Sequence, residues 1–216
     1  QHVVGRALKR LGMHGLYNRR LAGVLEPPRI RTLMGMYYRH VREDLDGLRP
    51  VLPDVPAGRP IRILDIGAGL GGIDVLLDRH YEGRTELHLL DKHGLSDIFY
   101  GYTTQAAFYN RIDLTRTFME DNGVPAGRFH CHNIDTDGFP AGAFDLVISL
   151  LSWCFHYPAA TYAENVAGAL AGGGVLIVDV RHDTDGAALL TDALGVPPRR
   201  LLTHGTYDRL AFVRPA

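Results

Sequence analysis

The chain has few cysteines and no long hydrophobic run. Only two cysteines, Cys131 and Cys154, occur among 216 residues, and they form neither a disulfide framework nor the spacing of a zinc site. The longest apolar run, residues 146–155, is interrupted by two serines and falls short of the roughly 20 residues that a membrane-spanning helix needs. No apolar segment typical of a secretory signal follows the basic residues 1–21. The sequence therefore predicts a cytoplasmic protein with reduced cysteines.

Net charge is also nearly absent, but it is unevenly distributed. The formal net charge is −1, although residues 1–50 contain ten lysines and arginines against four acids. This basic region indicates an anionic partner or a contact between subunits, and a solvated helix face is the simpler alternative. The partners considered are an anionic membrane, which residues 3–21 would touch at its surface, and a second copy in a homodimer.

The first 60 residues have the pattern of helices followed by a linker. Apolar residues at helical spacing predict a basic amphipathic helix over residues 3–21 and a second helix over about 30–48. Pro27 and Pro28 should break the helical pattern between them. Four prolines between residues 50 and 60 indicate a linker. We expect residues 1–60 to form a helical cap within the same domain as the remainder.

From residue 61 onward, the pattern changes to strands that alternate with helices. Several strands are nearly continuous apolar runs, as in a parallel sheet that is covered on both faces. The expected strands are 61–66, 86–90, 128–132, 144–150, 175–180, 200–203 and 209–213. The expected helices are 72–80, 106–122, 159–171 and 186–194. This order predicts a Rossmann-like α/β domain over residues 61–216.

A glycine loop joins the first of these strands to its helix. It reads Asp65-Ile66-Gly67-Ala68-Gly69-Leu70-Gly71-Gly72, and its glycines let backbone amides approach a ligand where a Cβ atom would collide. The spacing also satisfies the dinucleotide fingerprint, so the glycines alone do not separate nicotinamide from S-adenosylmethionine. Asp65 favours the latter, because it would repel a pyrophosphate but can hold the cationic amino group of S-adenosylmethionine.

This pattern resembles motif I of the class I S-adenosylmethionine-dependent methyltransferases. The same resemblance is carried by two later segments, Phe144-Asp145-Leu146-Val147-Ile148-Ser149 and Gly172-Gly173-Gly174-Val175-Leu176-Ile177-Val178-Asp179. It covers about residues 61–180 and implies a mostly parallel seven-stranded sheet with a C-terminal antiparallel hairpin. It also implies S-adenosylmethionine as methyl donor and S-adenosylhomocysteine as product. The alternatives are a non-catalytic methyltransferase-like binding or scaffold subunit and an NAD-dependent oxidoreductase.

The resemblance also implies which residues hold the donor. Asp91 ends the second strand, where a doubly wound fold places an acid that accepts from ribose hydroxyls. Asn133 would meet the adenine edge and Ile134 would pack on the ring, with Asp135 as the alternative if the register shifts. The full expected donor set is Asp65, Gly67, Ala68, Gly69, Asp91, Lys92, Asn133, Ile134 and Ser149.

The acceptor should lie beyond the fourth and fifth strands. Residues 152–158, Ser-Trp-Cys-Phe-His-Tyr-Pro, are similar to uncharacterised bacterial methyltransferases associated with sugars and polysaccharides. This similarity implies O-methylation of a sugar, a glycan or another hydroxyl-bearing small molecule. A hydroxyl acceptor needs a base, and histidine has a suitable pKa. His156 is the first candidate, as base or substrate anchor, with a packing role as the alternative, and His182 is the second.

Two further patterns argue against other functions. Residues 149–152 are not the Asn/Asp-Pro-Pro-aromatic box of nucleic-acid amino-methyltransferases, so a nucleic-acid substrate is not expected. His130 and His132 alternate on a strand and share a face. A metal site would need a further ligand, and the sequence makes none evident, so no metal is expected and two hydrogen-bonded histidines are the simpler interpretation.

Overall fold

The computed structural model describes residues 22–92 and 111–216. The basic helix expected over residues 3–21 and the first part of the helix expected over 106–122 lie outside these described residues. Within the described parts, no helix is both long enough and apolar enough to cross a membrane.

The chain divides into two compact units, residues 1–43 and 44–216. Helix α3 (Ala22–Leu48) spans the division, with its last residues in the second unit. The expectation that residues 1–60 belong to the same domain as the remainder stays a prediction.

The expected helix break at Pro27 and Pro28 is wrong, because α3 continues through both residues. Each proline lacks an N–H and so removes one hydrogen bond to the carbonyl four residues earlier. The two carbonyls that lose a donor are those of Gly23 and Val24, in the first turn of α3. The turns that follow Pro28 are unaffected, so a helix of 27 residues tolerates the pair.

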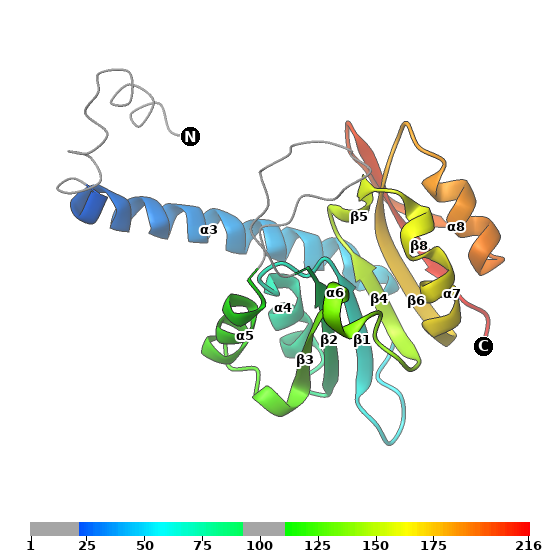
Figure 1. Ribbon diagram of the computed structural model, residues 1–216, viewed down its shortest axis with the longest axis horizontal. Coiled ribbons are helices and arrows are strands. Elements are labelled where there is room, and N and C mark those ends of the chain that lie inside the picture. The colour runs from blue at the N-terminus through cyan, green and yellow to red at the C-terminus, as the bar shows by residue number, and fades with distance from the viewer. Residues whose placement is uncertain (1–21, 93–110) are drawn as a thin grey trace. The chain divides into compact units, whose positions relative to one another are not determined.

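Seven strands of the second unit form one sheet in the order β3-β2-β1-β4-β6-β8-β7 (Figure 1). The strands are β1 (Ile61–Ile66), β2 (Thr85–Asp91), β3 (Phe129–Asn133), β4 (Phe144–Ser149), β6 (Leu170–Arg181), β7 (Arg199–Thr203) and β8 (Tyr207–Val213). The strands from β3 to β6 pair in parallel, whereas β8 is antiparallel to both β6 and β7. The expected parallel sheet with a C-terminal antiparallel hairpin is confirmed.

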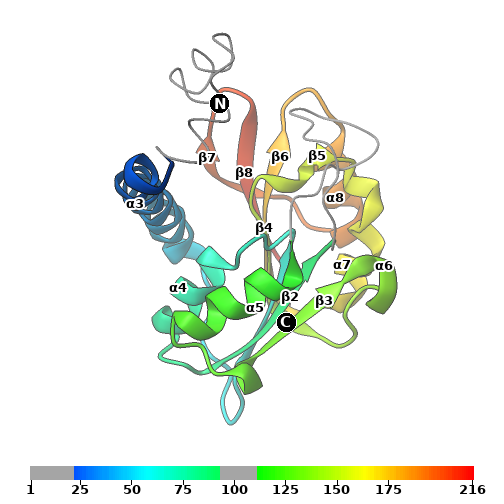
Figure 2. The same cartoon turned by 60° about the vertical axis from the view of Figure 1, so that its left-hand side comes forward.

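Helices cover both faces of this sheet. They are α4 (Gly72–His80), α5 (Ile112–Asp121), α6 (Ile134–Asp137), α7 (Ala163–Ala169) and α8 (Gly186–Leu194), with short 3-10 turns η2 (Arg49–Val51), η3 (Ala126–Arg128) and η4 (Ala159–Thr161). Figure 2 shows α4 and α5 on one face and α7 and α8 on the other. Because the strands from β3 to β6 are parallel, their carboxyl ends lie at the same edge of the sheet. Ligands bind at this edge in doubly wound sheets.

The junction between α7 and β6 differs from the expectation. The helix expected to reach residue 171 ends at Ala169, and β6 begins at Leu170 rather than at Val175. The three glycines that follow are poor helix formers, and Leu170 already pairs with Phe144 of β4. Strand pairing therefore starts five residues earlier than the apolar run alone indicates.

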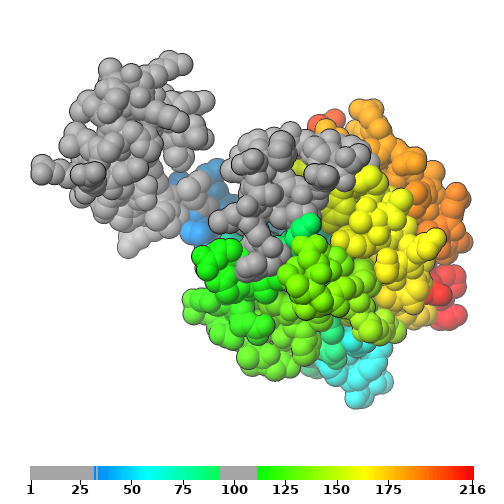
Figure 3. Space-filling model, viewed as in Figure 1, coloured from blue at the N-terminus to red at the C-terminus, as the bar shows by residue number. Residues whose placement is uncertain are grey.

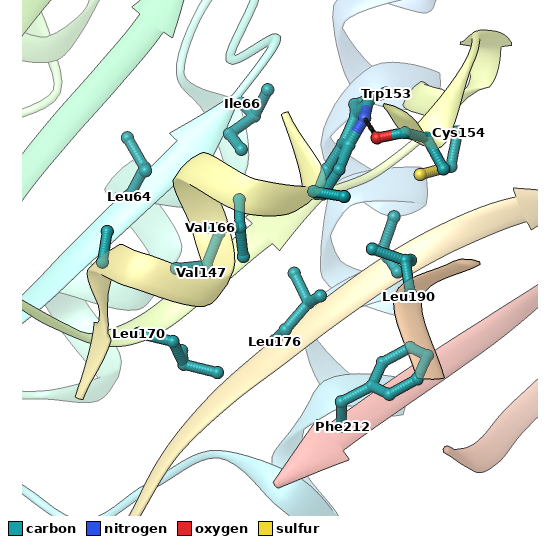
Figure 4. Packing of buried hydrophobic residues seen from close by; sticks show 14 of the residues in the cluster. Leu64, Ile66, Val147, Trp153, Cys154, Val166, Leu170, Leu176, Leu190 and Phe212 are labelled. Carbon is teal, nitrogen blue, oxygen red and sulfur yellow. Dashed lines mark hydrogen bonds between the residues drawn. The ribbon is translucent and has the colours of Figure 1, made fainter. Parts of the chain in front are cut away.

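A short strand, β5 (Ser152–Tyr157), follows β4 and was not expected. Its Trp153 is completely buried, and the indole Nε1 donates to the carbonyl of Ala159 at 3.1 Å. Figure 4 shows Trp153 among the apolar side chains of the core, which include Leu176 of β6 and Phe212 of β8. The segment after β4 is therefore anchored in the core rather than being a surface loop.

A buried ion network also holds the segment after β4, through the backbone of Leu151. Arg209 on β8 binds both oxygens of Asp179 on β6, at 2.7 and 2.9 Å, and also reaches Asp44 at the end of α3, at 2.7 Å. Asp179 further accepts from the N–H of Leu151 at 3.0 Å. Because Asp179 is inaccessible to solvent, this pairing is what allows its charge to be buried.

Candidate active site

The glycine loop turns sharply between β1 and α4. Gly67 and Gly71 have φ of 80° and 81°, which disfavours side chains. A Cβ on Gly67 would collide with the Oγ of Ser152, and one on Gly71 would lie 2.8 Å from the Sδ of Met119. Both glycines are therefore required by conformation and by close neighbours, and Ser152 is packed directly against the loop.

Hydrogen bonds fix the loop to the neighbouring strand and helix. The Gly67 N–H donates to the carbonyl of Leu90 at 2.7 Å, and the Gly69 N–H donates to Oδ2 of Asp91 at 2.8 Å. Thr115 of α5 donates its hydroxyl to the carbonyl of Gly69 at 2.6 Å. The structure thus brings Asp91 against the loop, as the sequence predicts. The other oxygen of Asp91, Oδ1, accepts from the N–H of Lys92 at 2.7 Å.

Behind the loop, Asp65 and Asp74 form a buried carboxyl pair. Asp65 is the penultimate residue of β1 and Asp74 lies in the first turn of α4, and both are buried. Burial raises the pKa of Asp65 well above its ordinary value, and the nearby Asp74 raises it further. Burial also raises the pKa of Asp74 to about 7. The raised pKa values favour a protonated carboxyl group in this pair around neutral pH.

Asp74 was missed by the sequence reasoning. Within the described residues, neither of its carboxylate oxygens has a conventional hydrogen-bond donor, so a protonated Asp65 is its side-chain partner. An acid amid the apolar residues Ile73, Val75 and Leu76 is the signal that could have indicated it, because a buried charge without a partner is costly.

The adenine-side residues lie beside Asp91. Asn133 is the register partner of Asp91 across β2 and β3. Its side-chain oxygen accepts from the N–H of Asp135 at 3.2 Å and so caps α6. Lys92 Nζ lies 3.3 Å from Oδ1 of Asp135, and Ile134 packs against the apolar core. The four side chains are gathered as expected, and their contact with adenine stays a prediction.

The surface around α6 adjoins the segment after β5. The Phe139 ring lies 5.8 Å from that of Tyr162. Figure 3 shows the corresponding green and yellow surfaces side by side. This ring pair therefore links the chain after α6 to the chain after β5.

Ser149 is placed differently from the other expected donor ligands. Its hydroxyl donates to the carbonyl of Ile66 at 2.7 Å and accepts from the N–H of Trp153 at 2.9 Å, and the residue is completely buried. These bonds tie the end of β4 to β1 and to β5. Ser149 therefore has a bracing role here, and its contact with a donor stays a prediction.

The backbone after β4 is held in uncommon conformations. Leu151 and Cys154 have φ of 51° and 65°, the left-handed region that residues other than glycine rarely adopt. The bond from Leu151 to Asp179 and the burial of Trp153 hold this segment in place. Such backbone concentrates at functional sites, and it directs the chain past Ser152 and Gly67.

The two candidate acceptor-side histidines have different neighbours. The His156 ring lies edge-on to that of Phe155, with centroids 4.8 Å apart. His182 follows β6, and its Nε2 lies 3.3 Å from Oδ1 of Asp208 on β8. The structure therefore gives His182 a carboxylate that can orient its ring. A base role for either histidine stays a prediction.

No family model matches the chain, and no curated protein matches it. Solved structures do. An O-methyltransferase family protein from Burkholderia thailandensis is 18% identical, with a TM-score of 0.56, over 82% of this chain and 57% of its own. Magnesium protoporphyrin IX methyltransferase from Synechocystis PCC 6803, with bound S-adenosylmethionine, is 18% identical, with a TM-score of 0.50, over 82% and 79%.

A third neighbour is a T. thermophilus 16S rRNA N2 G1207 methyltransferase in complex with AdoMet and guanosine. It is 18% identical, with a TM-score of 0.54, over 79% of this chain and 41% of its own. The chain thus spans little more than half of the Burkholderia protein and less than half of this one. These likenesses show the class I methyltransferase fold. The second and third proteins are named for different acceptors, magnesium protoporphyrin IX and 16S rRNA, so the fold does not select one.

Proposed function

From this fold, we propose that the chain is an S-adenosylmethionine-dependent methyltransferase. The observation that carries the proposal is the convergence of the glycine loop, Asp91 and the buried Asp65–Asp74 pair at the carboxyl edge of the sheet. These residues suit the donor, since its amino group is cationic and its ribose offers hydroxyl donors. Two neighbours with this fold were solved with the same donor.

Each residue would hold one part of the donor. When bound, S-adenosylmethionine supplies a methyl group that is already activated on a sulfonium, so the chain mainly has to bind and align. The Asp65–Asp74 pair would face the amino group and give up its shared proton on binding. Asp91 would accept from the ribose hydroxyls while it retains the Gly69 N–H. Asn133 would donate its amide to adenine while its oxygen caps α6.

The acceptor that we propose is a hydroxyl on a sugar or another small molecule. The similarity of residues 152–158 to sugar-associated methyltransferases supports it. Its proton must be removed by a base, and a histidine oriented by a carboxylate suits that role. His182 beside Asp208 has this arrangement, and His156, on the strand after β4, is the other candidate.

Calorimetric titration of the full chain with S-adenosylmethionine, S-adenosylhomocysteine and NAD tests the donor. We expect the two sulfur ligands to bind and NAD not to bind. Asp91→Ala should weaken donor binding about tenfold or more, because hydrogen bonds to a charged group contribute about 1.5–3 kcal/mol. The matched control Asp121→Asn changes an exposed acid and should leave binding unchanged. Binding of NAD alone would overturn the proposal.

Turnover with a panel of sugars and polyhydroxyl compounds separates an enzyme from a non-catalytic binding subunit. With an accepted substrate, we expect His182→Asn or His156→Asn to lower kcat about a hundredfold, to change the pH profile and to leave donor affinity intact. His204→Ala, an exposed histidine in the β7–β8 turn, is the control. If both variants retain normal turnover, neither histidine is the base.

The basic residues 3–21 support two proposals about partners. One is peripheral contact with an anionic membrane, and the other is a homodimer. Co-sedimentation of the chain, with and without these residues, with anionic and neutral vesicles tests the first. Equal and negligible binding to both vesicle types would contradict it. Sedimentation equilibrium tests the second.

A further inference from the structure

A second group of polar side chains lies on the sheet apart from the glycine loop, and we call it the histidine face. It comprises Glu86 and His88 on β2 and His130 and His132 on β3. His88 is the register partner of His130, and residues two apart on a strand share a face. All four side chains therefore project from the same face. The helix after β3, α6, has only four residues, and His130 is exposed.

Three of these residues can direct one ligand atom each to a common point. The ligand atoms of Glu86, His88 and His130 all lie within 4.8 Å of one another. In a tetrahedral zinc site, bonds of about 2.0–2.2 Å to nitrogen and oxygen separate neighbouring ligand atoms by about 3.3–3.6 Å. Small rotations of the exposed His130 side chain would bring its ligand atom to that separation, while His88 is buried and stays in place.

The contacts of His88 define the tautomer that a metal site would need. Its Nδ1 lies 3.0 Å from Nε2 of His132, and its Nε2 lies 2.9 Å from Oε1 of Glu86. A neutral imidazole can donate through only one nitrogen. When Nδ1 donates to His132, the lone pair of Nε2 faces Glu86 and lies 3.3 Å from Nη2 of Arg62, so a metal ion at Nε2 would replace that contact with Arg62. His132 then orients the ring in the way that partners of metal-bound histidines commonly do.

Arg62 of β1 limits the affinity of such a site. Its Nε donates to Oε1 of Glu86 at 3.0 Å, and its guanidinium lies over the Phe144 ring, 4.9 Å from the centroid. Its positive charge opposes a second cation nearby. The oxygen that Arg62 holds is Oε1, which also lies 2.9 Å from Nε2 of His88, so Glu86 would offer Oε2 to the metal ion. The expected affinity is therefore moderate rather than that of a closed structural zinc site.

We propose that Glu86, His88 and His130 bind a divalent transition metal ion, for which Zn²⁺ is the best match. Two imidazoles and one carboxylate form a common zinc ligand set, with water in the fourth position. The ion would join β2 to β3. These strands end three residues after His88 and His130, at Asp91 and Asn133, so the ion would brace the strands that carry two donor-site residues.

Titration of the metal-free full chain with Zn²⁺, in competition with a chromophoric chelator, tests this site. We expect one Zn²⁺ of moderate affinity per chain, and at least about tenfold weaker binding for His130→Ala and Glu86→Gln. His130 is exposed, so its replacement should leave folding intact, which circular dichroism without metal checks. His204→Ala removes an equally exposed histidine far along the chain and should bind like the unmodified protein.

Thermal unfolding gives an independent measurement. Zn²⁺ should raise the Tm of the unmodified chain and of His204→Ala, because an ion that binds only the folded state stabilises it. It should raise the Tm of His130→Ala much less. Absence of stoichiometric binding, or equal affinity and equal Tm shift in His130→Ala, would overturn the proposal. Neither measurement depends on methyl transfer.

Discussion

Replacing Asp74 by asparagine should make the protein more stable at alkaline pH. Asp74 and Asp65 are buried together, and their pKa values are raised chiefly by that burial. A raised pKa means that the folded state holds the proton more tightly than the unfolded state. Stability is therefore complete at low pH and is lost as pH rises through the folded pKa. Asparagine keeps the size of the side chain and removes the second charge.

The magnitude follows from the pKa of Asp74. Burial raises it from 3.8 to about 7, and one pKa unit corresponds to about 1.4 kcal/mol. Ionising Asp74 in the folded protein thus costs about 4 kcal/mol at most. Because the proton is shared with Asp65, we expect Asp74→Asn to raise the free energy of unfolding by about 2 kcal/mol above about pH 8. Below about pH 4 the gain should vanish.

Urea unfolding across this pH range measures the effect. The control is Asp78→Asn, on the same helix and also buried, whose carboxylate accepts from Thr85 and pairs with Arg128 at 3.1 Å. That variant should lose about 1–3 kcal/mol, because it breaks bonds that are made. If Asp74→Asn follows the same pH dependence as the unmodified protein, or is destabilised above pH 8, then ionisation of the buried pair does not destabilise the folded state by this amount.

Two further predictions concern the loop and the ion network. Gly67→Ala should lower stability by about 1–3 kcal/mol and weaken donor binding, because its Cβ meets Ser152; unfolding and calorimetry measure both, and adding Ser152→Gly should recover part of the loss. Arg209→Met should lower the free energy of unfolding by about 3–5 kcal/mol, because it leaves Asp179 buried without its cation. A loss below about 1 kcal/mol in urea unfolding would contradict that account.

The α/β framework could be predicted because its signals are local. The bounds of β1 and α4 were predicted as observed, since an apolar run ends in a glycine turn there. The helix through Pro27 and Pro28 and the strand β5 could not be predicted in this way. Both depend on what the rest of the chain contributes: hydrogen bonds along a long helix in one case, and a buried tryptophan in the other.

The same difference between local and tertiary signals separates the donor site from the proposed metal site. Asp65 and Asp91 stand at strand ends beside a glycine loop, so sequence position alone brings them together. The further ligands for His130 are Glu86 and His88, and nothing in the sequence joins them until the register of β2 and β3 is known. Contacts across neighbouring strands are set by tertiary pairing, which a single sequence does not display.

The order of the sheet also has a consequence for solubility. β3 and β7 are its two edge strands, and unpaired backbone groups at an edge can recruit strands from other molecules. Each edge strand has only five residues; β3 carries His130 and His132, and β7 begins with the exposed Arg199 and Arg200. Short, polar edges of this kind oppose aggregation. The two histidines of β3 thus also discourage intermolecular pairing.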